Sequence, residues 1–323
     1  MEENIHSDSI LLARVAWAYY CEGLTQAQVA HQLNLTRARV NRLLREGHKS
    51  GTVQIIINSS NIGRVQLESR LTRRYGLRQS IVVPTPTHDD RLYDSLGMAA
   101  GIFVSDHLRD DQSLGLGWGR TLSAGVRGIS QRARRNNTIV SLFGGLPHSH
   151  TTNPYEIASL FARRLRASEC YYIPAPMYAP SVEIKNHLIE QSQFRTVYER
   201  AARVDMALIG VGDLTPRSTN VQLGALSEEE WRSVLAAGAV SELFGHFLDA
   251  RGEPVDHPLN TRFMGPSLAD MHHIPLTVVV SGGLKKVPAL KAVLSKEYID
   301  ILITDETTAE ILTNGCPECG GSS

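Results

Sequence analysis

The chain has 323 residues, of which 42% are hydrophobic and 20% charged, and its 33 basic side chains balance its 33 acidic ones. This composition excludes an intrinsically disordered chain, and the zero net charge gives the whole molecule no field that would attract nucleic acid or membranes. The length suits two domains. Because no apolar run is long enough to span a membrane and the first residues are acidic, we expect a cytoplasmic protein without membrane contact.

The first 58 residues predict three helices followed by a short strand. A helix that ends at Gly23 precedes a second helix, which Thr25 caps with Gln28 completing a capping box. Thr36 caps a third helix, which Gly51 ends, and residues 52–57 have the pattern of a strand. The polar residues 58–61 follow as a break. We therefore expect a first domain at residues 1–58 and a connecting helix at 59–76.

Two capped helices joined by a tight turn at residues 33–35 are typical of a helix-turn-helix. Residues 37–49 carry five basic side chains and one acidic one, so this helix can contact phosphates and base edges. Double-stranded operator DNA is the predicted partner. The alternative is a small helical dimerisation domain with a solvated arginine face. The predicted DNA contacts are Thr25, Gln26, Thr36, Arg37, Arg39, Asn41, Arg42 and Arg45.

Residues 77–315 predict an α/β domain, and residues 316–323 a flexible tail. Short apolar runs alternate with helical segments, which indicates a doubly wound, largely parallel sheet. The expected strands are 81–83, 114–116, 139–143, 171–173, 207–211, 276–280 and 299–303. Several of these strands end in glycine-rich turns. Because ligands of such sheets bind beyond the carboxyl ends of the strands, the turns at 115–121, 144–150, 210–213 and 281–286 predict one shared site.

Several segments in this order resemble the SorC-type family of bacterial transcriptional regulators. They are LTQAQVAHQLNLTRARVNRLLREGHKSGTVQIII near the start, GLGWGRTL, LFGG, IGVGD, GHFLDARG, and SGGLKKVPALKAVL followed by IDILITDETTAEILT. The resemblance runs nearly from end to end. It implies a helix-turn-helix joined to a sugar-binding domain that is similar in fold to sugar-phosphate isomerases. It also implies an effector-controlled regulator of carbohydrate genes that forms a homo-oligomer, usually a tetramer.

The predicted partner of the second domain is a small sugar, polyol or sugar phosphate. Residues 112–155 contain no acidic side chain but five arginines, including Arg120 and Arg127, which favours an anionic group. The glycines of residues 115–119 alternatively serve only close packing of a strand and a helix. The family pattern favours Lys286 over Lys285. The predicted effector contacts are Gly117, Trp118, Gly119, Arg120, Thr121, Gly144, Gly145, Asp213, Asp249, Gly282, Gly283 and Lys286.

An enzyme is the competing interpretation, namely a sugar-phosphate isomerase or hydrolase with an added helical domain. Such an enzyme needs a general base, and the glycine turns offer Asp213 without an evident partner. A DNA-bridging protein without effector is a third possibility. Neither the histidine pairs 148/150 and 272/273 nor the single CxxC at 316–319 has the partners of a metal or redox site. We therefore expect no catalytic residue, no metal and no cofactor.

Overall fold

The computed structural model describes residues 2–50, 52–53, 61–88, 91–130, 136–147, 151–216 and 218–314. The chain forms two compact units, residues 1–62 and residues 63–323. The predicted strand at 52–57, the polar break and the tail at 316–323 lie largely or wholly outside the described residues. The predicted boundaries at 58 and 315 therefore stay predictions. Among the described residues, no helix is both long and apolar enough to cross a membrane.

The first unit is built from three helices around a small core. These are α1 (Glu2–Tyr20), α2 (Gln26–Gln32) and α3 (Arg37–Lys49). Apolar side chains three and four residues apart place one face of each helix inward. Their buried members are Val15, Ala18, Val29, Ala30, Val40, Leu43 and Leu44. The three predicted helices are thus present, and the predicted inward positions of the third helix are buried.

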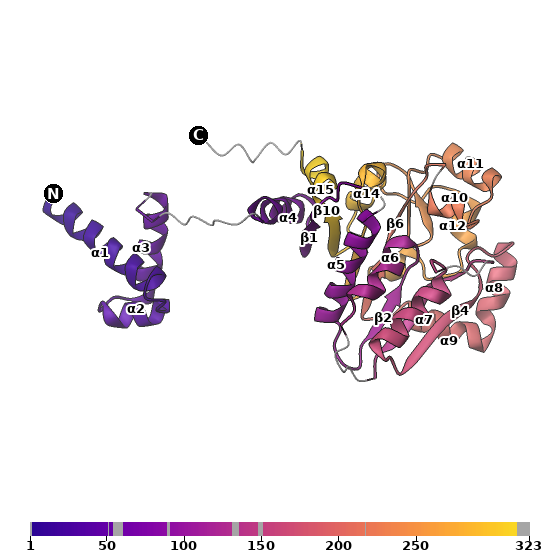
Figure 1. Ribbon diagram of the computed structural model, residues 1–323, viewed down its shortest axis with the longest axis horizontal. Helices are drawn as coiled ribbons and strands as arrows, with labels where there is room; N and C mark the ends of the chain where they lie inside the picture. Colours follow the sequence, from indigo (N-terminus) through magenta and orange to yellow (C-terminus); the bar gives the residue numbers. More distant parts are fainter. Residues whose placement is uncertain are drawn as a thin grey trace. The chain divides into compact units, whose positions relative to one another are not determined.

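The second unit is organised around a seven-stranded parallel sheet with the strand order β1-β10-β9-β5-β2-β3-β4 (Figure 1). The strands are β1 (Gln79–Val83), β2 (Ser113–Leu116), β3 (Thr138–Gly145), β4 (Glu169–Pro176), β5 (Met206–Ile209), β9 (Thr277–Val280) and β10 (Ile301–Asp305). Strands β2, β5, β9 and β10 are almost completely buried, as expected of central parallel strands that are covered on both faces. The predicted α/β class is confirmed.

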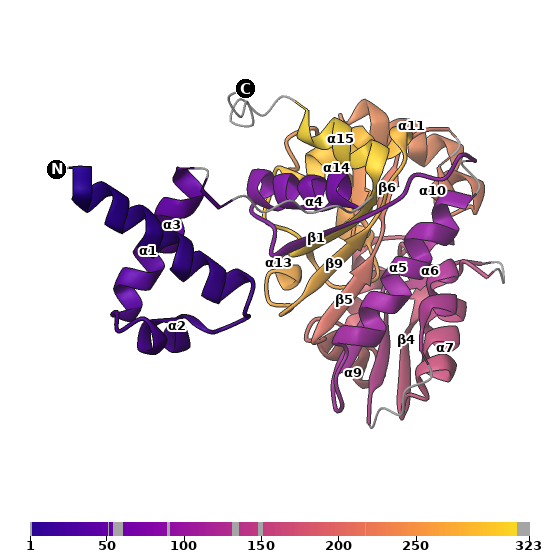
Figure 2. The same ribbon diagram turned by 60° about the vertical axis from the view of Figure 1, so that its left-hand side comes forward.

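Helices lie on both sides of the sheet (Figure 2). They are α4 (Ile62–Tyr75), α5 (Leu92–His107), α6 (Arg120–Gly125), α7 (Pro154–Leu165), α8 (Val182–Glu190), α9 (Ser192–Ala201), α10 (Thr219–Gln222), α11 (Glu228–Ala236), α12 (Pro258–Arg262), α13 (Leu268–Met271), α14 (Val287–Leu294) and α15 (Glu306–Thr313), with short 3-10 turns η2 (Val126–Gly128) and η3 (Leu284–Lys286). Helix α5 packs against β1, β9 and β10, whereas α7 packs against β2, β3 and β4.

A small antiparallel sheet, absent from the sequence-based prediction, is inserted in the chain between β5 and β9 of the large one. It consists of β6 (Val211–Asp213), β7 (Ser241–Leu243) and β8 (His246–Leu248). The single strand expected at 207–211 is divided at Gly210, so that β5 belongs to the large sheet and β6 to the small one. Three-residue strands carry too few residues to show a hydrophobic period, which explains why the pattern missed them.

Helix α4, expected as a connecting segment, belongs to the second unit. Leu67 and Leu71 are buried in the main core of that unit. Two further contacts fix the helix: the backbone N–H of Val82 donates to Glu68 (2.9 Å), and the Tyr75 hydroxyl donates to the backbone carbonyl of Leu312 (2.9 Å). The helix therefore starts the α/β unit rather than only leading to it.

Candidate functional site: a basic helix-turn-helix and a polar cleft

Side-chain caps fix where α2 and α3 begin. The Thr25 hydroxyl accepts from the backbone N–H of Gln28 (3.4 Å), while the Gln28 side chain accepts from the backbone N–H of Thr25 (2.9 Å). Thr36 accepts from the backbone N–H of Arg39 (3.2 Å). Between the helices, Asn34 adopts a left-handed backbone conformation (φ 52°), which reverses the chain within three residues. Thr25 and Thr36 therefore have structural roles in addition to any contact with DNA.

The outer face of α3 collects the other predicted DNA contacts. Val40, Leu43 and Leu44 hold the inner face in the core, so the remaining positions point outward. The exposed predicted contacts on this helix are Arg37, Arg39, Asn41, Arg42 and Arg45. Arg42 lies 3.8 Å from Glu46 in a solvent-exposed ion pair that contributes little stability. The face thus presents four arginines and an amide to solvent.

The first unit also has a cleft between the end of α1 and the first residues of α2 and α3, which was not predicted from the sequence. Its lining includes Tyr19, Tyr20, Thr25, Gln26 and Arg37. The two tyrosine rings stand edge to face, with their centroids 4.8 Å apart. Three predicted DNA contacts therefore lie beside two aromatic residues at the end of α1. A tyrosine hydroxyl can donate to a phosphate oxygen, but two tyrosines on an apolar helix carried no sequence signal that separated them from core residues.

In the second unit, a cleft opens beyond the carboxyl ends of neighbouring strands β2, β5 and β9. The turns after β2 and β9 contribute predicted residues, as does β6, which follows β5 directly. The predicted residues in the lining are Trp118, Gly119, Arg120, Thr121, Asp213, Gly282 and Lys286. The cleft thus brings together seven of the twelve residues proposed for the effector, from three of the four turns, and none from the turn at 144–150.

The Lys286 ammonium is already engaged by groups of this cleft. It donates to the backbone carbonyl of Val211 (2.6 Å) and forms an ion pair with Asp213 (3.1 Å). Asp213 also accepts from the hydroxyl and the backbone N–H of Thr215 (2.5 and 3.0 Å). Burial opposes ionisation of Asp213, but Lys286 and Thr215 outweigh it and lower the pKa of this carboxyl. Asp213 is therefore a carboxylate at neutral pH.

A second acid of the cleft, Glu242, was missed by the sequence analysis. Its side chain accepts from the backbone N–H of Gly245 (2.6 Å), and burial raises its pKa. Beside it lies the buried side chain of Asn220, whose hydrogen bonding to Glu242 lowers the pKa of that carboxyl less than burial raises it. The cleft thus holds an amide and a carboxyl side by side, which can donate to and accept from a ligand. Glu242 comes from β7 and Asn220 from α10, and no motif distinguished either segment.

Five predicted effector contacts do not line this cleft. A side chain at Gly117 would crowd Ile209, and one at Gly144 would come within 2.4 Å of the Pro176 carbonyl, so both glycines serve close packing. Gly145 packs against the Tyr155 ring in the same way. Gly283 has a left-handed conformation (φ 93°), and its N–H donates to Asp305 and Thr308 (2.8 Å each).

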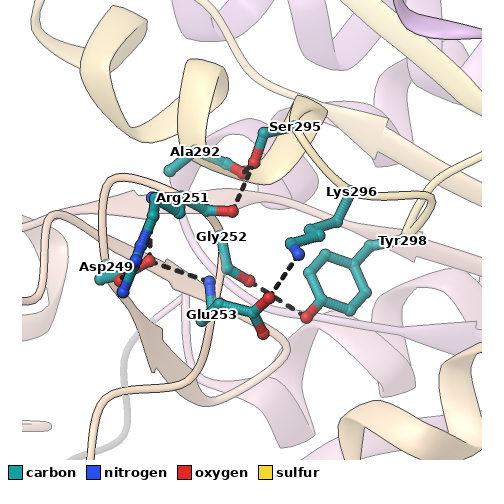
Figure 3. A network of polar contacts seen from close by, with 8 residues as sticks. All are labelled: Asp249, Arg251, Gly252, Glu253, Ala292, Ser295, Lys296 and Tyr298. Atoms are coloured by element: carbon teal, nitrogen blue, oxygen red, sulfur yellow. Dashed lines mark hydrogen bonds and ion pairs between the residues drawn. The ribbon is translucent and has the colours of Figure 1, made fainter.

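Asp249, the fifth, stabilises a turn instead. It accepts from the backbone N–H groups of Arg251 (2.8 Å) and Glu253 (3.0 Å) and pairs with the Arg251 guanidinium. Figure 3 shows how this turn is attached to the segment after α14, through the bonds of Ser295 to the Arg251 carbonyl, Tyr298 to the Gly252 carbonyl, and Lys296 to Glu253. The turn thus links β8 to the end of α14, and the geometry gives Asp249 a structural role.

The arginines expected to favour an anion have partners of their own where they are described. Arg127 forms an ion pair with Asp94, and Arg120 donates to Gln222 (2.8 Å) while lying over the Tyr93 ring. The other three arginines of this stretch, at 132, 134 and 135, lie outside the described residues, as do the histidines at 148 and 150. Within the described ranges, no group of three histidine, cysteine, aspartate or glutamate residues is placed to hold a metal ion.

Residues 59–314 match the family described as "Putative sugar-binding domain". The chain is 32% identical over 311 residues to the erythritol catabolism regulatory protein EryD of Brucella abortus, which covers 95% of this chain and 97% of that protein. It is 34% identical over 312 residues to the transcriptional regulator LsrR of Klebsiella pneumoniae, covering 93% of this chain and 91% of the relative. In fold it is similar to the full-length sorbitol operon regulator SorC of Klebsiella pneumoniae, with a TM-score of 0.73 and 24% identity over 95% of this chain and 99% of the other.

Proposed function

Because the chain belongs to the SorC-type family of transcriptional regulators, we propose that it binds operator DNA through α3 and releases or engages that DNA in response to a small carbohydrate. A cytoplasmic location belongs to this proposal. The observation that carries it is the presence, in one chain, of an exposed arginine face on a capped helix-turn-helix and a polar cleft at the strand ends. The names of the relatives, which refer to erythritol and sorbitol, support a carbohydrate effector.

Hydroxyl groups of the effector are the proposed partners of Asp213, Glu242 and Asn220. A carboxylate accepts from a hydroxyl, and the two N–H groups of the Asn220 amide can donate to a hydroxyl or carbonyl oxygen. Two carboxyl groups face one ammonium here, so the charge of Lys286 is already balanced. A phosphate at Lys286 would compete with Asp213 and approach Glu242. Lys286 is therefore proposed to orient Asp213 and to contact a hydroxyl rather than to hold a phosphate.

A phosphate group, in an effector that carries one, is proposed to lie at the turn of residues 119–121. This end of the cleft offers the Arg120 guanidinium and the Thr121 hydroxyl, whereas the Gly119 N–H already donates to the Thr152 carbonyl (3.3 Å). The Gly283 amide is unsuited to the same task because Asp305 and Thr308 already accept its hydrogen. The sequence predicted an anionic site at two glycine turns. We propose only the first of these turns, at residues 115–121, as the position of a phosphate.

Ligand titrations test both parts of the proposal. Free sugars and polyols and their monophosphates are titrated by calorimetry against the wild type and the Arg120→Ala and Glu242→Gln variants. We expect Glu242→Gln to weaken every bound ligand about tenfold, and Arg120→Ala to weaken only monophosphates. A monophosphate that binds Arg120→Ala as tightly as the wild type would exclude the phosphate position. Failure of all these compounds to bind would exclude the carbohydrate effector.

Catalysis is the alternative function for this cleft, and it can be tested. A buried glutamate with a raised pKa, close to an ionised aspartate, is a pairing that isomerases use for general acid and base work. We propose that the cleft binds without turnover, because the relatives are named as regulators. Incubation with sugar phosphates followed by product analysis decides this. Turnover that Glu242→Gln abolishes would establish an enzyme and overturn the regulator-only interpretation.

A further inference from the structure

Asp305, the last residue of β10, carries a carboxyl group that is completely buried and does not itself line the cleft. Its Oδ1 accepts from the Thr85 hydroxyl (2.9 Å) and from the backbone N–H of Thr308 (3.1 Å). Its Oδ2 accepts from the backbone N–H of Gly283 (2.8 Å) and from the Thr308 hydroxyl (2.6 Å). A buried carboxyl group needs such partners, and these come from three separate segments: the loop after β1, the turn after β9 and the first turn of α15.

A helix cap accounts for only one of the two oxygens of Asp305. The bond from the Thr308 N–H to Oδ1 caps the N-terminus of α15. Asparagine and serine cap helices about as well as aspartate does, so capping does not require a carboxyl group. A carboxylate differs from these side chains because its two acceptor oxygens can serve backbone N–H groups of two segments at once. The second oxygen of Asp305 serves the turn after β9.

This turn leads directly to Lys286 in the cleft. The turn begins beside β10, because the N–H of Ser281 donates to the carbonyl of Ile303 (3.0 Å). Gly283 then has a left-handed backbone conformation (φ 93°), and η3 continues to Lys286, whose N–H donates to the Gly283 carbonyl (2.9 Å). The position of Gly283 therefore determines whether the Lys286 ammonium reaches Asp213.

The turn and the buried carboxyl group are packed closely against each other at Gly282. A Cβ atom at this residue would come within 2.3 Å of Oδ2 of Asp305, so only glycine fits there without a shift. Gly282 also lines the cleft. A displacement of the turn relative to Asp305 would therefore change the lining of the cleft directly.

We propose that Asp305 is a positioning residue, which holds the turn at residues 281–286 and through it the ammonium of Lys286. In this position the ammonium contacts both Asp213 (3.1 Å) and the Val211 carbonyl (2.6 Å). Without the bond from Oδ2, the turn is free to move, and the side chain of Lys286, which is 19% exposed, becomes accessible to reagents. The benefit for an effector rests on the proposed function, in which the effector contacts Asp213.

The substitution Asp305→Asn separates the positioning role from the cap. Asparagine has one acceptor oxygen, so one of the two backbone N–H groups must face an NH2 group instead. The oxygen is expected to stay with the cap, because the Gly283 N–H also has the Thr308 hydroxyl as an acceptor (2.8 Å), and the NH2 group then lies against the turn. A role in capping alone therefore predicts an unchanged turn, whereas a positioning role predicts that the turn loosens.

Acetylation of lysine side chains in the full-length protein measures the turn without effector or DNA. The reagent is N-hydroxysuccinimide acetate, and peptide mass spectrometry gives the rates at three lysines of the same sample. Lys286 is the probe. Lys185, which donates to the Thr261 carbonyl (3.1 Å), reports general loosening, and the exposed Lys285 reports the dose of reagent.

We expect Lys286 to be acetylated about fivefold faster in Asp305→Asn than in the wild type, which is the factor that the loss of one hydrogen bond gives. The rates at Lys185 and Lys285 should not change. The matched control is Asp300→Asn, which makes the same substitution next to the other end of β10, where the carboxyl group also accepts from a backbone N–H (2.8 Å). This control should leave the rate at Lys286 unchanged.

Two outcomes overturn the proposal. A rate at Lys286 in Asp305→Asn equal to that of the wild type would mean that Asp305 only caps α15. An equal rise at Lys286 and Lys185 would mean that the substitution loosens the whole unit. If Asp305→Asn does not fold, Gly282→Ala replaces it with the same two criteria, because its methyl group pushes the turn away from Asp305 and leaves the cap intact. A wild type that binds no carbohydrate would refute the proposed function and leave these rates unaffected.

Discussion

At the residue scale, the two candidate sites differ in how their charges are held. The arginines of α3 lie in solvent, where Arg42 and Glu46 form a weak pair. In the cleft of the α/β unit, Lys286 and Asp213 are mostly buried, with side chains 19% and 11% exposed, and are fixed by several bonds. Exposed charges remain available to a polyanion such as DNA, whereas the buried pair is positioned in advance for a small ligand.

The first prediction concerns α3. Arg39→Ala and Arg42→Ala should each weaken operator binding about tenfold and lower the salt dependence by about one unit, because each removes a phosphate contact. Glu46→Gln should strengthen binding, since it removes the acid that pairs with Arg42. Filter binding or fluorescence anisotropy on a natural operator at several salt concentrations measures both effects. Arg195→Ala, on α9 of the second unit, is the control. Unchanged affinity and salt slope in both arginine variants would contradict the assignment of α3.

The second prediction concerns His246 in β8. Burial lowers its pKa to about 4, from 6.5 in an unfolded chain. The unfolded state binds the proton more readily than the folded state. The contribution of His246 to the free energy of unfolding is therefore fully present above pH 6.5 and is lost as the pH falls from 6.5 towards 4. The loss attributable to His246 should reach about 2 kcal/mol at pH 5. Urea unfolding of the wild type, His246→Gln and, as control, the exposed His273→Gln measures it. An identical pH dependence in His246→Gln would refute the assignment.

At the element scale, contacts between glycines determine where α6 lies, and α6 carries Arg120 and Thr121. A Cβ atom at Gly97 would come within 2.5 Å of the Thr121 carbonyl, and one at Gly101 within 2.1 Å of the Gly125 carbonyl. Helices α5 and α6 thus approach so closely that a side chain larger than that of glycine does not fit at positions 97 and 101. The position of one wall of the cleft therefore depends on a helix contact formed outside it.

The third prediction follows from this contact. Gly101→Ala should destabilise the second unit by about 1–3 kcal/mol and weaken effector binding, since α6 must shift to admit the methyl group. Gly63→Ala in α4, where an added Cβ meets no atom within 4 Å, is the matched control. It should be neutral or stabilise the protein by less than about 1 kcal/mol. Thermal unfolding with and without ligand measures both variants, and equal stability of the two would contradict the described packing.

At the scale of the whole molecule, the α/β unit carries the cleft proposed for the effector and the helical unit carries the arginine face proposed for DNA. A single helix-turn-helix covers too little DNA for high specificity, so we expect two or more copies to bind an operator together. Val65, which is exposed on α4, offers apolar surface for a contact between copies of the second unit.

The fourth prediction is that the protein is a dimer or tetramer in solution. Light scattering at micromolar concentration, with and without operator DNA, measures the mass. Val65→Glu should reduce the assembly, because it places a charge on the exposed face of α4. The control is Arg64→Glu, which adds the same side chain at the neighbouring position of α4. A monomer under every condition would contradict the prediction.

The fifth prediction is that the effector stabilises the protein against heat. At a ligand concentration 100 times the dissociation constant, binding to the native state alone should add about 2.7 kcal/mol. Differential scanning fluorimetry against sugars, polyols and their phosphates measures the shift. If Glu242→Gln shows a thermal shift as large as that of the wild type at the same ligand concentration, the stabilising ligand does not use the cleft.

The amino-acid sequence by itself determined the features that rest on local or periodic patterns. Caps at Thr25 and Thr36, the arginine face of α3 and seven apolar strands could be recognised because each depends on neighbours in the chain. Only the tertiary structure decided which strand-end residues share a cleft. Glu242 and Asn220 enter it from separate segments, whereas Asp249 is held in its turn by residues 251–253. Side-chain neighbours of this kind depend on how distant segments pack, and no spacing within one segment encodes that distance.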